Sequence, residues 1–284
     1  MNTIQAIAAP LMSATAAAIV QAAPAPAAVP SSAPAPAPAS AGPSNQELQL
    51  AFDALRKYDQ GSARGALLPI DRAVTAFQRD SDQAKSLRQT LATILAEPCS
   101  TVAKDYACRR LALIAGHEEV PALAALLAVP ALAHPAAQAL SISSEPKAAE
   151  ALRSALQTLK DKLSRIAVLD ALGALGDRRA IRLLAKTTRD ADPDVRKAAI
   201  AGLGGINDKR AARVLQASIR DAAPGAPSAA LGDAAIRCAE RLRANNDAKS
   251  AQSLLQTVAE SPSLPKHVRD AALRQAEASS AIQG

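Results

Sequence analysis

Leucines set twelve residues apart recur along this chain. The six pairs are Leu55 and Leu67, Leu111 and Leu123, Leu140 and Leu152, Leu172 and Leu184, Leu203 and Leu215, and Leu242 and Leu254. The stretches LGALGDRRAIRLL from Leu172 and LGGINDKRAARVL from Leu203 repeat one pattern 31 residues apart. A period of this length is typical of helix-turn-helix units that stack on one another. It predicts an all-α fold, an α-solenoid of antiparallel helix pairs with the leucines in its core.

The composition favours helices over strands. Hydrophobic residues make up 49% of the chain, but aromatic residues only 1%, so the apolar residues are mostly Ala, Leu, Ile and Val. Alanine has the highest helix propensity and lets helices approach closely. No stretch combines β-branched or aromatic enrichment with strict alternation, so a sheet is not expected.

The first 45 residues differ from the rest. Residues 4–20 form an uncharged apolar run that is followed by small residues suited to cleavage near Ala22 or Ala23. This predicts a signal peptide over residues 1–22 and export to the periplasm or the outside of the cell. The run lacks an early Lys or Arg, and Pro10 interrupts it; if the segment stays uncut, the protein is membrane-tethered or cytoplasmic. The apolar run is too short and too broken to span a membrane, so we expect no membrane span in the mature chain.

The remaining boundaries follow from composition and from the leucine spacing. Residues 23–45 are Pro, Ala and Ser, which predicts a disordered linker. Residues 46–221 are expected to form the solenoid. Between Leu203 and Leu242 the spacing stretches to 39 residues, which places a loop at residues 222–232. Residues 233–284 should then form a C-terminal helical hairpin or cap.

The stretch RDADPDVRKAAIAGLGGINDKRAARVL, residues 189–215, resembles a HEAT repeat of the short kind named after phycobilisome bilin lyases. The matching residues are Asp190, Asp192, Pro193, Val195, Arg196, Ala198, Ala199, Leu203 and Leu215. The leader and repeats together are similar to those of bacterial HEAT-repeat proteins. The resemblance implies that Asp190, Arg196 and its register-mate Arg165 belong to a structural ladder of Asp and Arg that pairs within or between units.

The net charge of +7 lies mostly in the second half of the chain. Residues 161–284 hold 20 Lys and Arg against 14 Asp and Glu. Arginine on exposed helix faces keeps an Ala-rich protein in solution, which accounts for this excess without a partner. An acidic partner, a nucleic acid or an anionic membrane surface is the alternative explanation.

Motifs that carry chemistry are missing from the sequence. There is no GxxxxGK loop, no HExxH pair and no GxSxG elbow, and the three histidines, His117, His134 and His267, are far apart in the sequence. We therefore expect no enzyme, no cofactor and no metal site. Cys108 and Cys238 fall in helical stretches and should be buried. Cys99 precedes a helix start, where a thiol pKa can fall, so it stays a candidate reactive thiol.

These observations predict a scaffold or adaptor that binds a protein or peptide partner on a concave surface. The residues expected to project there are Arg165, Asp170, Asp194 and Lys197. Two alternatives stay open: an enzyme subunit of the bilin-lyase type, by analogy of fold alone, and a salt-dependent nucleic-acid binder that uses the basic C-terminal half. The near absence of aromatic stacking platforms and the export signal disfavour nucleic acid.

Overall fold

The structure is a computed structural model, and it describes residues 42–78, 81–143, 145–222 and 229–281. Fourteen α-helices and two short 3₁₀ helices occupy these ranges, and no strand is found in them. Ser40–Gly284 forms one compact unit. The predicted signal peptide and most of the predicted linker lie outside the described residues.

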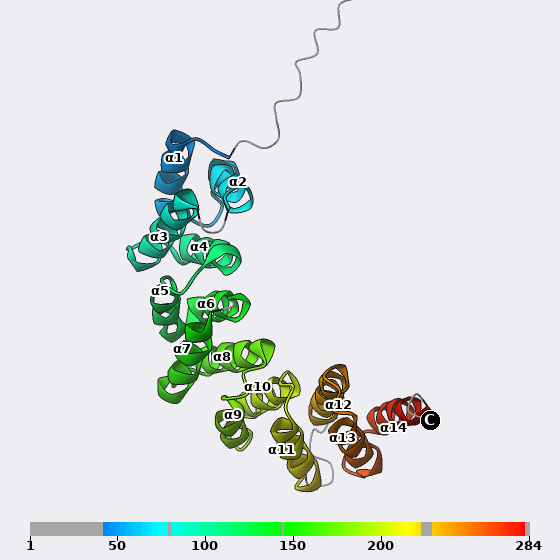
Figure 1. Cartoon of the computed structure of the whole chain (residues 1–284). Helices are drawn as coiled ribbons and strands as arrows, with labels where there is room; N and C mark the ends of the chain where they lie inside the picture. The colour runs from blue at the N-terminus through cyan, green and yellow to red at the C-terminus, as the bar shows by residue number, and fades with distance from the viewer. Residues whose placement is uncertain (1–41, 79–80, 144, 223–228, 282–284) are drawn as a thin grey trace, which may run out of the picture. The chain divides into compact units, whose positions relative to one another are not determined.

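The helices of this unit form two layers (Figure 1). The odd-numbered layer consists of α1 (Asn45–Arg56), α3 (Asp82–Ala96), α5 (Val120–Ala125), α7 (Pro146–Thr158), α9 (Ile181–Thr187), α11 (Lys209–Arg220) and α13 (Ala248–Glu260). The even-numbered layer consists of α2 (Leu68–Ala76), α4 (Thr101–Ile114), α6 (Pro130–Ile142), α8 (Lys162–Leu175), α10 (Pro193–Gly204), α12 (Ala229–Ala244) and α14 (Lys266–Ala281). The 3₁₀ helices are Arg64–Leu67 and Leu126–Ala128.

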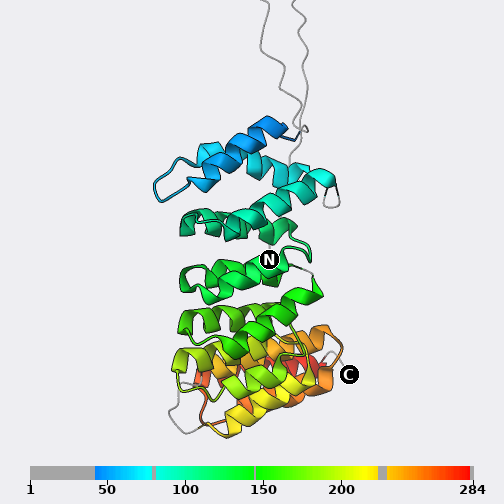
Figure 2. The same ribbon diagram turned by 90° about the vertical axis from the view of Figure 1, so that its left-hand side faces the viewer.

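The predicted solenoid is confirmed, and the leucine pairs form its core. Successive helix pairs lie one above another in Figure 2. All twelve leucines of the six pairs are at most 1% exposed, and they join a continuous cluster of buried apolar side chains. Burying one leucine stabilises the fold by roughly 1.5 to 3 kcal/mol, but here it requires a neighbouring unit to cover it.

Short sequence signals set the helix ends in the central units. The Asp192 carboxylate caps α10 by accepting hydrogen bonds from the backbone N–H groups of Asp194 and Val195 at 2.8 and 3.3 Å. Helix α8 ends at Gly176, whose φ of 64° lies in the left-handed region. The N–H of Asp177 then reaches back to the carbonyl of Leu172, and this closes the Schellman motif typical of a glycine stop.

Glycines bring the backbones of α8, α10 and α12 into direct contact. A Cβ atom on Gly173 of α8 would lie 2.6 Å from the Cα of Gly202 on α10. A Cβ atom on Gly204 of α10 would lie 2.6 Å from the carbonyl oxygen of Ala234 on α12. No side chain fits at either place, so the three helices lie closer together than a larger residue would permit.

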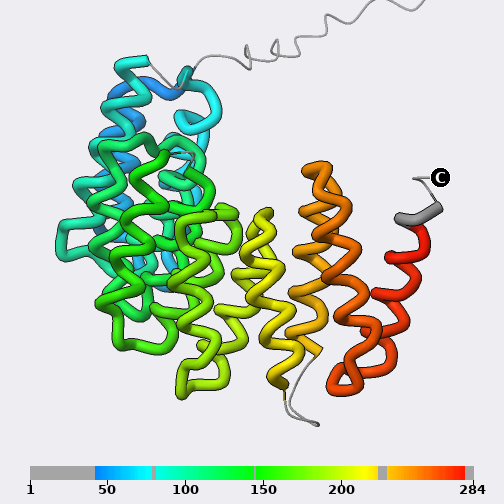
Figure 3. The backbone as a smooth tube through the Cα atoms, turned by 60° about the horizontal axis from the view of Figure 1, so that its bottom comes forward, coloured from blue at the N-terminus to red at the C-terminus, as the bar shows by residue number. Residues whose placement is uncertain are grey.

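The row of helices changes direction at α10, with α12 and α14 turned away from the line of α1 to α8 (Figures 1 and 3). The even-numbered helices from α4 to α12 pack closely on one another, whereas α9 and α11 of the other layer barely touch. The closely packed side of a curved stack is the inside of its bend. We call the even-numbered helices the inner layer.

The C-terminal part begins earlier than the sequence predicts. Helix α12 starts at Ala229, so helix occupies the last four residues of the expected loop 222–232. The physical reason is burial: Leu231 is only 6% exposed, and Gly232 lies against Val268, where a Cβ atom would have no room. Residues 223–228 lie outside the described ranges.

The resemblance implied a ladder in which Asp and Arg side chains pair within or between units. The structure contains such contacts, but Arg165 and Arg196 use different kinds of partner. Arg165 of α8 forms an ion pair with Asp190, which precedes α10, and so joins neighbouring units. Arg196 does not pair with the Asp190 carboxylate; its Nη1 donates to the backbone carbonyls of Asp190 and Ala191 at 2.7 and 2.9 Å. The hydrogen bond from Arg165 is the main reason why the pKa of Asp190 lies below its ordinary value.

Replacing Gly173 with Ala should destabilise the unit by about 1 to 3 kcal/mol, because the new methyl group meets backbone atoms of Gly202 that cannot turn aside. Chemical denaturation measures the effect. The matched control is Gly65→Ala, since a Cβ atom there has no neighbour within 4 Å, and it should stay within about 0.5 kcal/mol of the parent protein. Equal stability of the two variants would contradict the close glycine contact.

The variant Asp190→Asn should cost about 1 kcal/mol at pH 7, because it removes the charge that faces Arg165 while keeping an oxygen for the N–H of Asp192. A carboxyl with a lowered pKa stabilises the fold above its unfolded pKa, and that stability is lost as the pH falls through the folded pKa. The difference between variant and parent should therefore shrink as the pH falls through the folded pKa of Asp190, measured by urea unfolding at pH 7 and at a series of lower pH values. A difference that persists in acid would rule out the ion pair as its source.

Candidate interaction groove

A groove of about 1470 Å³ opens between the α9–α10 pair and the α11–α12 pair. The end of α9, the N-terminal half of α10, the C-terminal half of α11 and the first turn of α12 form its walls, and Pro265 also lines it. All these elements belong to the region where the row of helices changes direction (Figure 3).

The groove opens away from the close backbone contact of α10 with α12. Their close contact, between Gly204 and Ala234, lies at the C-terminal end of α10. The groove is lined by the opposite half of α10, residues 193–200, and by the first turn of α12. In the other layer α9 and α11 have few contacts, so the two pairs separate there.

The floor and walls of the groove are largely apolar. Ile200 of α10 and Val214 of α11 are half-buried, and Leu231 of α12 is nearly covered. Small side chains, among them Ala185 and Ala217, leave the walls smooth. An apolar surface of this kind that stays open to solvent is typical of a site where another molecule binds.

Charged side chains surround this floor. The cations are Lys186 and Arg189 at the end of α9 and Arg196 and Lys197 on α10; the carboxylates are Asp194 and Asp221. The formal net charge of the lining is therefore +2. Lys186, Arg189 and Lys197 are all exposed.

Two of the charged groups are already engaged within the fold. The guanidinium of Arg196 donates to backbone carbonyls, and the carboxylate of Asp194 accepts from Lys162 of α8. Lys186, Arg189 and Lys197 form no side-chain hydrogen bond or ion pair with any part of the chain that the structure describes. These three cations are the groups that remain for a bound molecule.

The predicted surface residues separate into two groups. Asp194 and Lys197 line the groove, whereas Arg165 and Asp170 lie outside it. Arg165 is occupied by the ion pair with Asp190. The sequence analysis did not predict Lys186 and Arg189, which lie at the end of α9 in the odd-numbered layer. The broken leucine spacing after Leu203 was the only sign of the groove in the sequence.

Asp170 occupies a different part of the inner layer. Its side chain projects from α8 into solvent, yet the surrounding protein displaces enough water to raise its pKa above the ordinary value. The charges of His134 on α6 and Arg237 on α12 act in the opposite direction.

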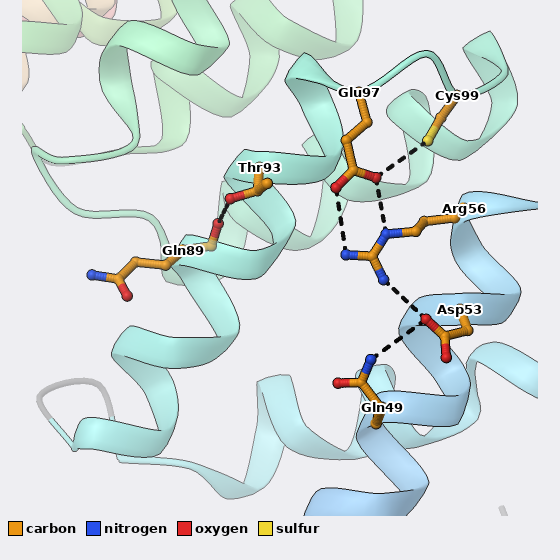
Figure 4. A network of polar contacts seen from close by, with 7 residues as sticks. All are labelled: Gln49, Asp53, Arg56, Gln89, Thr93, Glu97 and Cys99. Carbon is orange, nitrogen blue, oxygen red and sulfur yellow. Dashed lines mark hydrogen bonds and ion pairs between the residues drawn. The ribbon is translucent and has the colours of Figure 1, made fainter.

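The surroundings of Cys99 disfavour a reactive thiol. Figure 4 shows Arg56 of α1 donating to both oxygens of Glu97, with distances of 2.9 and 3.4 Å, and the Cys99 thiol donating to the same carboxylate at 3.9 Å. Burial and then the negative charge of Glu97 raise the thiol pKa. The network ties α1 to the end of α3, so its evident role is structural.

The other cysteines are buried, as the sequence predicts. Cys108 and Cys238 are inaccessible to solvent, and desolvation raises the pKa of each thiol to about 12. Among the residues that the structure describes, no three His, Cys, Asp or Glu side chains lie close enough together to hold a metal ion. None of the helices in the same ranges combines the length and the apolar character of a membrane-spanning segment.

Comparison with solved structures returns helical proteins of low similarity. The complex of CpcE and CpcF of phycocyanin lyase from Nostoc sp. PCC7120 is 20% identical, with a TM-score of 0.41, over 85% of this chain and 97% of that one. Human deoxyhypusine hydroxylase in complex with glycerol is 16% identical, with a TM-score of 0.32, over 82% of this chain and 96% of that one. At these scores neither structure bears on what this chain binds.

Among curated proteins, no sequence matches the chain. A family model for HEAT repeats matches residues 154–234, from the middle of α7 to the second turn of α12. This range contains the glycine contacts and most of the groove lining. The match agrees with the two layers of paired helices and the buried leucines, and the chain is a HEAT-repeat protein.

Proposed function

We propose that this protein is a scaffold that binds a protein or peptide partner in the groove between α9–α10 and α11–α12. The observation that carries the proposal is the combination of an open apolar floor with three cations that have no partner in the described chain. Burying the floor would supply affinity, and the charged rim would orient the partner. The groove holds a partner in this proposal and performs no chemistry.

The rigidity of the surrounding units supports a binding role. The glycine contacts fix α10 against α8 and α12, and the ion pair of Arg165 with Asp190 ties α8 to the turn that precedes α10. A preorganised groove loses little conformational entropy when a partner binds. Contacts on neighbouring inner helices, including the exposed Asp170, would extend the bound surface.

A photo-crosslinking residue in place of Ala217, an exposed position on the groove wall, should capture a protein partner in cells that make the full chain. The same residue in place of Ser154, exposed on α7 and away from the groove, is the matched control. The crosslinked species, separated by electrophoresis and identified by mass spectrometry, should appear only with the Ala217 substitution. Equal capture at both positions, or none at Ala217, would contradict the proposed function.

A further inference from the structure

We infer that the segment held in the groove is acidic and carries aliphatic side chains. The inference rests on the proposed function and names the chemistry of its partner. Charge complementarity, the apolar floor and the size of the groove each support it.

The three cations with no partner lie on two sides of the groove. Lys186 lies in the last turn of α9 and Arg189 in the turn that follows the helix, and both line the groove. Lys197 projects from α10, which packs against α9. Carboxylates spaced along a bound segment could reach all three cations, and each would neutralise a charge that has no counterpart in the described fold.

The carboxylates of the lining favour a peptide over a nucleic acid. Asp221 is exposed at the end of α11, and no ion pair involving it is found among the described residues. A nucleic acid carries one negative charge on the phosphate of every nucleotide, so it would bring negative charge close to the Asp221 carboxylate. A peptide can place an uncharged residue opposite Asp221 and carboxylates opposite the cations.

The floor selects for aliphatic side chains, and the volume limits the length of the segment. Ile200, Val214 and Leu231 have no polar side-chain atom to offer a bound molecule. An α-helix is about 10 Å wide and rises about 1.5 Å per residue, so the groove volume corresponds to roughly three helical turns. A short amphipathic segment with Glu or Asp beside Leu, Ile or Val fits these limits.

The test uses fluorescein-labelled synthetic peptides of about twelve residues and the full chain, with binding followed by fluorescence anisotropy. The first peptide is built from Glu, Leu and Ala so that Glu and Leu occupy different faces of a helix. One counterpart has Lys at every Glu position, another has Ser at every Leu position, and a single-stranded oligonucleotide of equal charge is the fourth probe. We expect the Glu and Leu peptide to bind at least about tenfold more tightly than each counterpart and than the oligonucleotide.

The triple variant Lys186→Glu, Arg189→Glu and Lys197→Glu should weaken binding of the Glu and Leu peptide by about tenfold or more. Its matched control is Arg182→Glu, Lys209→Glu and Arg213→Glu, which changes the net charge equally at exposed positions outside the groove and should stay within about twofold. Thermal unfolding checks that both triple variants are folded. The variant Ile200→Ser tests the apolar floor separately. It should weaken binding of the Glu and Leu peptide more than binding of the peptide with Ser at every Leu position.

Several outcomes would overturn the inference. The Glu and Leu peptide and its Lys counterpart could bind equally tightly, or the oligonucleotide could bind more tightly than the Glu and Leu peptide. The two triple variants could also lose the same amount of affinity for that peptide. The crosslinking experiment at Ala217 separates this failure from failure of the proposed function. A captured partner whose crosslinked segment is basic or lacks aliphatic residues would keep the scaffold and reject the acidic segment, whereas no captured partner would reject the scaffold itself.

Discussion

The direct backbone contact of α8, α10 and α12 is the constraint on which the rest of the structure depends. Gly173 meets Gly202, and Gly204 meets Ala234, at distances that leave no room for a side chain. These contacts draw the inner layer together near the C-terminal end of α10. Since α9 and α11 have few contacts with each other, the two helix pairs separate on the opposite side, and the groove opens there.

The charges of the repeats fall into two sets with different roles. Arg165 and Arg196 form their polar contacts within the fold. Arg165 pairs with the Asp190 carboxylate, and Arg196 donates to backbone carbonyls. Lys186 and Arg189 lie next to the same turn but face the groove and stay unengaged within the described residues. Part of the basic excess of the second half of the chain is therefore concentrated at an apolar opening.

Local sequence patterns predicted the elements well, since helix period, capping and burial are properties of neighbouring residues. The twelve leucines are buried, and Asp192 caps α10 as its place before Pro193 indicates. The site was harder to predict. Asp194 and Lys197 do line the groove, but Arg165 was expected there and is held by Asp190 instead, because a one-unit pattern does not show which side chain a neighbouring unit brings near.

By itself, the sequence determined an all-α solenoid with a leucine core and the interruption after Leu203. Only the tertiary structure decided that Gly204, the last residue of α10, joins two helices by their backbones. The groove opens away from that contact, and both Lys186 and Lys197 line it. The physical reason is that the angle between neighbouring units depends on which atoms touch across them, and residues far apart in the sequence set it together.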